Sequence, residues 1–222
     1  MYIDETITQF KKELQKNGKI GLLLDIDETL SWTLGHWVVV MQEKFGNPEN
    51  LSVKELIKKY RYTEHVPYWQ TPEAKEWMQQ AILDNDLQEA LPIIENANHI
   101  ANKVHKIIPI VGYLTLRPTA VLDGTRQWLK KHGFPDEPLL LRPDNIPHGD
   151  GYEWKAHVLV HLYPEVTGIV DDNARMLQYL PDEYKGTIYL YDTESFEGTN
   201  LNVIPCKTWD DVYDKVKGQS GL

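Results

Sequence analysis

The stretch GLLLDIDETLSW, residues 21–32, places three consecutive leucines directly before a group of acidic side chains. The leucines at 22–24 have the continuous apolar character of a short strand buried on both faces, as in parallel sheets. Asp25, Asp27 and Glu28 follow within four residues of one another. Because burying an unpaired carboxylate costs several kcal/mol, the sequence predicts a positively charged partner at the end of this strand.

Strand-like and helix-like segments alternate along most of the chain. The predicted strands are 19–25, 106–115, 138–141, 166–172 and 186–192, and the predicted helices of this part are 4–17, 87–100, 118–133, 153–162, 173–180 and 208–216. Strands that alternate with helices of this length favour a parallel sheet with right-handed crossovers. The expected fold class is α/β: a Rossmann-like parallel sheet flanked by helices, with a small helical region inserted after the first strand.

The inserted region differs in composition from the rest of the chain. Tryptophans occur in it among charged helical stretches. Ser52 with Glu55 is typical of a capping box at the start of a helix, and Thr71 followed by Pro72 is typical of another helix start. The predicted division is residues 1–31 and 87–222 as the α/β core and residues 32–86 as a helical cap.

Composition restricts the classes of partner. The 222 residues carry 23 basic and 33 acidic side chains, a formal net charge of −10, which opposes binding to duplex nucleic acid. A single cysteine, no signal-like leader and no apolar run of the ~20 residues that cross a bilayer favour a cytoplasmic protein without membrane contact. The sequence leaves the oligomeric state open.

Polar side chains end three of the predicted strands: Asp25 and Asp27 after the first, Thr115 and Arg117 after the second, and Asp171 and Asp172 after the fourth. Ligands of open parallel sheets bind outside the carboxyl ends of the strands, so these groups are expected to converge. Carboxylates from two strand ends suit Mg²⁺, which takes one or two protein carboxylates, waters and phosphate oxygens. Lys155, on the helix before the strand that carries Asp171, adds a second cation.

This set of residues resembles a known signature. DIDET at 25–29, Thr115 after an apolar strand, Lys155, and IVDD at 169–172 are similar to the four motifs of the haloacid dehalogenase (HAD) superfamily of phosphohydrolases. Their order and spacing agree with that family over nearly the whole chain. In the family a second aspartate, present here as Asp27, favours phosphoester hydrolysis over dehalogenation.

The resemblance implies a role for each matching residue. Asp25 would be the nucleophile that forms an aspartyl-phosphate, and Asp27 the general acid and base. Thr115 and Lys155 would hold the phosphoryl group. Mg²⁺ would be bound by Asp25, the backbone carbonyl of Asp27 and Asp171, with support from Asp172. The implied activity is Mg²⁺-dependent hydrolysis of a small phosphomonoester.

The position of the insertion matches the point where the C1 helical cap of the family enters. Segments within and after it look like the 5'(3')-deoxyribonucleotidase-like branch, which implies a nucleotide substrate. The chain departs from that branch at Glu28 and Thr29, where a glycine more often precedes the threonine or valine. The base and sugar preference is therefore left open.

Several residues have two readings. Arg117 is interpreted either as a second phosphate ligand or as a structural ion-pair partner. The aromatic residues of the cap either stack on a nucleobase or form the core of the cap. Asp171 and Asp172 could instead cap the helix that follows them. His157 and His161 have zinc-ligand spacing, but we interpret them as part of a helix face, because no catalytic glutamate lies between them.

Alternative functions share the same site. It could transfer the phosphoryl group to another acceptor, or remove phosphate from a polynucleotide or lipid, although the charge of −10 argues against polynucleotides. A non-catalytic protein that binds a phosphorylated ligand is the alternative from another class, and the presence of both Asp25 and Asp27 argues against it.

Overall fold

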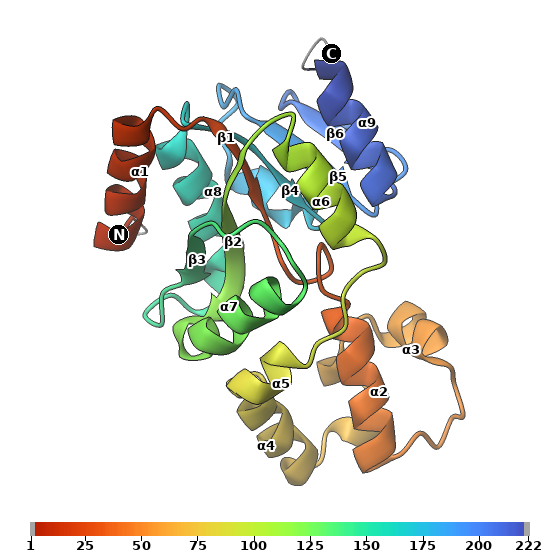
Figure 1. Ribbon diagram of the computed structural model, residues 1–222. Coiled ribbons are helices and arrows are strands. Elements are labelled where there is room, and N and C mark those ends of the chain that lie inside the picture. Colours follow the sequence, from red (N-terminus) through yellow and green to blue (C-terminus); the bar gives the residue numbers. More distant parts are fainter. Residues whose placement is uncertain (1–2, 220–222) are drawn as a thin grey trace.

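One parallel sheet organises the chain in the computed structural model, which describes residues 3–219 (Figure 1). Its strands, in the order β3-β2-β1-β4-β5-β6, are β3 (Leu139–Arg142), β2 (Ile110–Pro118), β1 (Gly21–Leu24), β4 (Val166–Asp171), β5 (Thr187–Tyr191) and β6 (Val203–Cys206). Every pair of neighbours is parallel. The expected α/β class with a parallel sheet is confirmed, and β1 lies at its centre.

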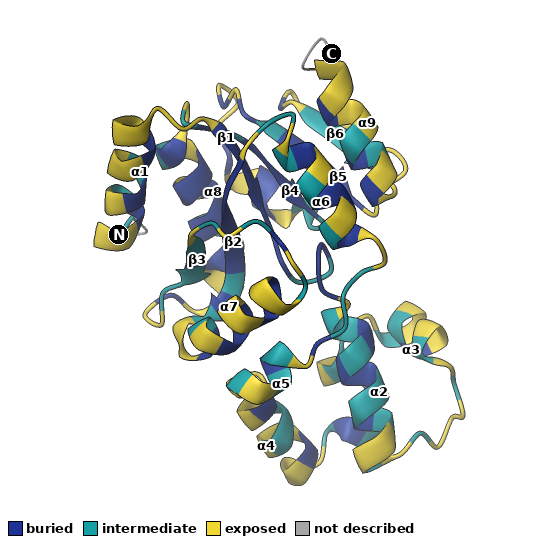
Figure 2. Cartoon of the chain, in the orientation of Figure 1, coloured by how far each residue is buried: buried dark blue, intermediate teal, exposed yellow. Residues whose placement is uncertain are grey.

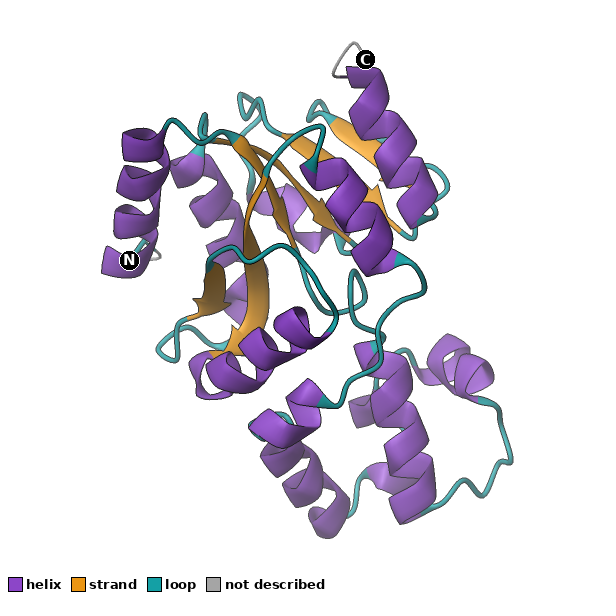
Figure 3. Cartoon of the chain, viewed as in Figure 1, coloured by secondary structure: helices purple, strands orange, loops and turns teal. Residues whose placement is uncertain are grey.

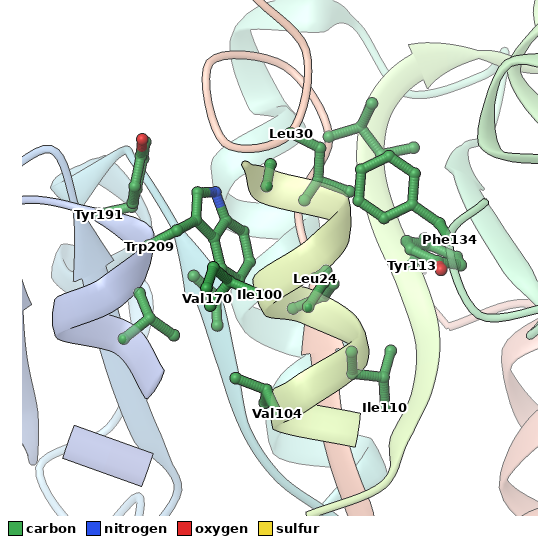
Figure 4. Close-up of a cluster of buried hydrophobic side chains, with 14 of the residues drawn as sticks. Leu24, Leu30, Ile100, Val104, Ile110, Tyr113, Phe134, Val170, Tyr191 and Trp209 are labelled. Carbon is green, nitrogen blue, oxygen red and sulfur yellow. The ribbon is translucent and has the colours of Figure 1, made fainter. Parts of the chain in front are cut away.

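Helices cover both faces of the sheet. They are α1 (Glu5–Asn17) and α8 (Gly151–Leu162) on one face and α6 (Ala97–His105), α7 (Leu122–Lys131) and α9 (Trp209–Gln219) on the other. Successive side chains of β1 point to opposite faces, so Leu23 joins the cluster beneath α1 and α8. Leu24 joins the other cluster, where it packs with Val170 and with Ile100 of α6 (Figure 4). The apolar run is therefore buried on both sides (Figure 2).

A helical insert follows β1, as expected (Figure 3). It contains α2 (Thr33–Phe45), α3 (Val53–Tyr60), the 3₁₀ turns Thr63–His65 and Pro67–Trp69, α4 (Pro72–Ala81) and the short α5 (Asn85–Glu89). The capping box of Ser52 with Glu55 and the cap of Thr71 are both present. The insert has a small core of its own, formed by Val38, Met41, Leu56, Val66, Trp69 and Ala74.

The insert also meets the sheet layer through α5. The Asn85 amide donates to the backbone carbonyl of Ala120 at 2.9 Å, and its carbonyl accepts from the backbone amide of Gly124 at 2.6 Å. Gly124 lies on α7, so both ends of the insert are attached to the part of the molecule that contains the sheet. The division at residues 86 and 87 stays a prediction.

Local structure differs from the sequence expectations at several points. The helix expected over 87–100 is wrong: α5 ends at Glu89, Pro92 follows, and the Ile94 amide donates to Leu30 in an extended segment before α6. The helix expected at 173–180 is a 3₁₀ helix, Ala174–Tyr179. Strand β6 is not among the predicted strands. It contains Pro205, which is tolerated because β6 is an edge strand. Within residues 3–219, no helix is long and apolar enough to cross a membrane.

Gly168 tests the register in which β4 pairs with β5, where it lies opposite Thr187. It lies in β4, and a Cβ added there would overlap with the backbone carbonyl of Thr187 in β5. We expect Gly168→Ala to lower the free energy of unfolding by about 2 kcal/mol or more, because overpacking forces the backbone to shift. Gly149→Ala is the matched control, since a Cβ there meets no atom within 4 Å. Urea denaturation of both variants measures the difference, and equal stability would contradict the register.

Candidate active site

Three buried polar side chains lie at the carboxyl edge of the sheet. Asp25 directly follows β1, Thr115 lies in β2 on one side and Asp171 ends β4 on the other. The backbone amide of Asp25 donates to the carbonyl of Val170 at 2.9 Å, which fixes the loop after β1 against β4. Exposed fractions are 4% for Asp25, 0% for Thr115 and 1% for Asp171. Because β1 is central, the strand order itself brings these groups together.

Lys155 supplies the positive charge that the opening stretch requires. It lies on α8 with 2% exposure, and its Nζ donates to Asp25 Oδ1 at 2.6 Å and to Asp171 Oδ2 at 2.7 Å. Burial opposes the charge of the amine, but the carboxylates of Asp171 and Asp25 outweigh it and raise the pKa of Lys155. Lys155 is therefore a permanent cation that joins two strand ends.

The carboxylates exceed this positive charge. Asp25, Asp171 and Asp172 each offer one oxygen, and these oxygens lie within 4.8 Å of one another. Burial raises the pKa of Asp25 to about 7 against the attraction of Lys155, with repulsion from Asp171 and Asp27 adding to the effect. Burial and repulsion from Asp171 and Asp25 raise the pKa of Asp172 as well. A set of hard oxygen donors with excess negative charge fits a divalent cation such as Mg²⁺.

No other group of three or more potential metal ligands occurs in residues 3–219, so His157 and His161 do not form one. The carboxylate of Asp27 is also outside the group. The sequence expectation concerned its backbone carbonyl, and that ligand stays a prediction. The cap of the following 3₁₀ helix is Asn173, whose side chain accepts from Arg175, so Asp172 is not used as a helix cap.

Asp27 faces Arg117 instead of Lys155. The Arg117 Nη2 donates to Asp27 Oδ1 at 2.7 Å and its Nε lies 3.1 Å from both carboxylate oxygens. The hydroxyl of Thr33 donates to the same carboxylate at 2.6 Å. Burial raises the pKa of Asp27, but the charge and hydrogen bonds of Arg117 and the bond from Thr33 outweigh it, so the net shift is downward.

The surroundings of Arg117 bear on its two readings. It is 5% exposed, and its Nη1 donates to Thr125 Oγ1 at 3.2 Å in addition to its contacts with Asp27. These contacts are those of the ion-pair partner, and a role in phosphate binding stays a prediction. The Thr115 hydroxyl accepts from the backbone amide of Arg117 at 3.3 Å.

Thr29 is a site residue to which the sequence analysis gave no role. Its hydroxyl donates to Asp25 Oδ2 at 3.4 Å and accepts from the backbone amide of Asp172 at 3.1 Å. Its carbonyl accepts from the indole of Trp209 at 2.9 Å. Thr29 thus links the loops that carry Asp25 and Asp172. Its place at the end of the DIDET motif was the available signal.

The first helix of the insert begins on carboxylates of the site. Glu28 has a positive φ of 59°, and its side chain accepts from the backbone amide of Leu34. This bond replaces a side-chain cap, which the N-cap residue Trp32 does not provide. Burial raises the pKa of Glu28 to about 7 in spite of the bond from Leu34. Together with the bond from Thr33 to Asp27, this fixes the start of α2 directly beside the candidate general acid.

The aromatic residues of the insert divide into two groups. Trp37 and Trp69 are buried in hydrophobic clusters, with exposures of 5% and 1%, so for these two the core reading holds. Trp32 is 39% exposed, and Tyr60 and Tyr62 are half-buried. Tyr68 is half-buried as well. A role in base stacking stays a prediction for these four residues.

Comparison with known structures gives the class of this fold. A HAD-superfamily hydrolase of Geobacter sulfurreducens matches 89% of the chain and 96% of its own, with 13% identity and a TM-score of 0.53. A HAD-family hydrolase of Deinococcus radiodurans, solved with bound phosphate and sodium, matches 91% of the chain and 96% of its own, with 12% identity and a TM-score of 0.52. The chain has the fold of the HAD-superfamily hydrolases, which confirms the resemblance seen in the sequence.

One curated protein gives a closer comparison. A Bacillus cereus protein with the name "Putative nucleotidase" is 23% identical over 193 residues, which cover 87% of the chain and 96% of that protein. No family model matches the chain. The cap subtype stays a prediction. Because one fold supports many chemistries, the activity has to be argued from the site.

Proposed function

We propose that the protein is a Mg²⁺-dependent phosphomonoester hydrolase that acts on a small phosphorylated metabolite through an aspartyl-phosphate. The observation that carries this proposal is the junction of Asp25 and Asp171, from separate strand ends, on the Lys155 amine at 2.6 and 2.7 Å. A buried nucleophilic carboxylate, a fixed cation and a set of metal ligands at one point are the parts that phosphoryl transfer requires. The name of the Bacillus cereus relative supports a nucleotide as the substrate.

The residues divide the reaction into two displacements. An oxygen of Asp25 attacks phosphorus and the bond from phosphorus to the leaving oxygen breaks, while Asp27 gives that oxygen a proton. Asp27 has to take up this proton before the step, because Arg117 lowers its pKa. Asp27 then accepts a proton from water, whose oxygen attacks phosphorus and breaks the bond to Asp25. Lys155 and the Thr115 hydroxyl hold the phosphoryl oxygens. A Mg²⁺ held by Asp25, Asp171 and Asp172 would supply charge neutralisation for the phosphoryl group.

Release of phosphate from p-nitrophenyl phosphate, with Mg²⁺ and with EDTA, tests the proposal. A panel of nucleoside monophosphates and sugar phosphates then ranks the substrates. We expect turnover that is lost on chelation. Absence of turnover on every substrate, with Mg²⁺ still bound, would contradict the proposal and favour a protein that only binds a phosphorylated ligand. Transfer to added alcohols in place of water would favour a phosphotransferase.

Asp27→Asn tests the proposed general acid. Since p-nitrophenolate leaves without protonation and an alcohol does not, we expect kcat/KM to fall by about 10²–10⁴-fold on a nucleoside monophosphate. The fall on p-nitrophenyl phosphate is expected to be much smaller. The parameter kcat/KM is used because it reports on the first displacement only. Equal losses on the two substrates would show that Asp27 does not protonate the leaving oxygen.

A further inference from the structure

The insert contacts the sheet layer at a third place, beside the proposed metal ligands. Arg175 lies four residues after Asp171, on the 3₁₀ helix that follows β4. Its Nη2 donates to the hydroxyl of Tyr62 at 2.8 Å. Tyr62 belongs to the insert and lies directly before the 3₁₀ turn Thr63–His65. One hydrogen bond therefore connects the insert with the loop that carries the metal ligands.

Two aromatic faces hold the same guanidinium. Its central carbon lies 5.6 Å from the ring centre of Tyr62 and 5.5 Å from that of Tyr152 on α8, which is the range of cation–π attraction. Among residues 3–219, no carboxylate lies within ion-pair distance of Arg175. The Arg175 guanidinium thus contacts one tyrosine of the insert, Tyr62, and one tyrosine of the sheet layer, Tyr152.

Tyr152 continues the connection to the carboxylates. Its hydroxyl accepts from the side-chain amide of Asn173 at 2.8 Å, and the backbone amide of Asn173 donates to Asp171 Oδ1 at 2.9 Å. The other oxygen of Asp171 is held by Lys155. A short series of contacts therefore leads from Tyr62 of the insert through Arg175, Tyr152 and Asn173 to a proposed metal ligand.

We propose that Arg175 is a positioning residue that ties the insert to the metal-binding loop, so that closure of the insert and binding of Mg²⁺ favour each other. The inference rests on the proposed function for the identity of the ion. Arg175 acts through Tyr62 and Tyr152 and does not need to touch the reacting atoms. Because linkage is reciprocal, the factor by which Mg²⁺ stabilises the closed insert equals the factor by which closure tightens Mg²⁺.

Hydrogen exchange of the backbone amides at residues 59–66, measured without metal, reports how far Arg175 stabilises the segment around Tyr62. We expect Arg175→Gln to speed exchange there by about two- to fivefold, the effect of losing a cation–π contact at a partly exposed site. Arg126→Gln is the matched control, because it also removes an exposed arginine, one that pairs with Asp123 on α7. Unchanged exchange in the Arg175 variant, or the same change in both variants, would overturn the proposal.

The coupling has its own readouts. With saturating Mg²⁺, exchange at 59–66 is expected to slow in the wild type and much less in Arg175→Gln. The Kd for Mg²⁺, measured by calorimetry, is expected to rise in the variant by the factor that separates the Mg²⁺-dependent slowing of exchange in the two proteins. Arg175→Lys is expected to recover part of both the slowing and the affinity. Equal slowing in both proteins with the same Kd would overturn the coupling. If the wild type binds no Mg²⁺, the proposed function and the coupling both fail, while the metal-free comparison still decides whether Arg175 ties the insert.

Discussion

Asp25→Asn is expected to lower the rate of p-nitrophenyl phosphate hydrolysis by about 10⁴-fold or more, because the amide oxygen cannot act as the nucleophile. The variant keeps the size of the side chain and an oxygen that can accept from Lys155. Circular dichroism and the binding of inorganic phosphate provide the controls for folding and for the site. Retained turnover in a variant shown by mass spectrometry to contain asparagine would exclude Asp25 as the nucleophile.

The same variant is expected to be more stable than the wild type at high pH when metal is absent. The pKa of Asp25 is raised from 3.8 to about 7 in the folded protein. The wild type therefore has a favourable contribution below pH 4 that is lost as the pH rises toward 7, and the neutral amide of the variant has no such loss. We expect the variant to gain on the order of 1–2 kcal/mol at pH 8 relative to pH 4, or about 2–4 °C in Tm per kcal/mol.

Thermal unfolding of both proteins in EDTA at pH 4 and pH 8 makes this comparison. A variant that loses stability relative to the wild type as the pH rises would contradict the excess of negative charge at the site. Added Mg²⁺ is expected to remove the difference in stability between the variant and the wild type. The ion neutralises the carboxylates of the wild type, and it finds one carboxylate ligand fewer in the variant, so it stabilises the wild type more.

Lys155→Met is expected to have the largest effect on stability. Removing the amine leaves the carboxylates of Asp25 and Asp171 buried without their shared cation, and breaking a buried pair in this way costs about 3–5 kcal/mol. Added Mg²⁺ is expected to recover part of the loss, because it binds the same carboxylates. Phosphatase activity is expected to be lost, since the phosphoryl group loses a fixed positive charge.

Lys207→Met is the matched control for Lys155→Met. Lys207 also bonds to an aspartate, Asp192, at 2.6 Å, but the two side chains are 50% and 67% exposed. An exposed pair of this kind contributes about 0–1 kcal/mol. Denaturation in urea at pH 8 compares the two variants. Similar losses in the free energy of unfolding would mean that the buried bonds of Lys155 to its two carboxylates stabilise the fold no more than an exposed ion pair does.

The placement of Asp25, Thr115 and Asp171 at one edge of the sheet could be predicted because it depends on one rule. Parallel strands present their carboxyl ends at a single edge, so residues that end different strands meet without any knowledge of side-chain packing. The apolar run before Asp25 predicted a strand buried on both faces from its composition alone. The capping signals of Ser52 and Thr71 were equally local, and both helix starts were confirmed.

Other features depend on how distant segments pack, which no local pattern specifies. The pairing of Arg117 with Asp27 was one of two open readings, because an arginine near a strand end suits phosphate and carboxylate equally well. The contact of Tyr62 with Arg175 depends on the orientation of the insert. The helix expected over 87–100 was wrong because Pro92 interrupts it. Proline lacks a backbone N–H and favours extended backbone at the residue before it, and apolar periodicity does not detect this break.

Direct trapping of the phosphorylated residue tests the central claim most sharply. The wild type is mixed with Mg²⁺ and p-nitrophenyl phosphate, quenched during turnover and treated with hydroxylamine, which attacks an acyl phosphate and leaves a hydroxamate on the carboxyl group. Peptide mass spectrometry is expected to find the hydroxamate on Asp25, and none when EDTA replaces Mg²⁺. A hydroxamate on a different residue, or none while phosphate is released and a known aspartyl-phosphate is trapped in parallel, would contradict the mechanism.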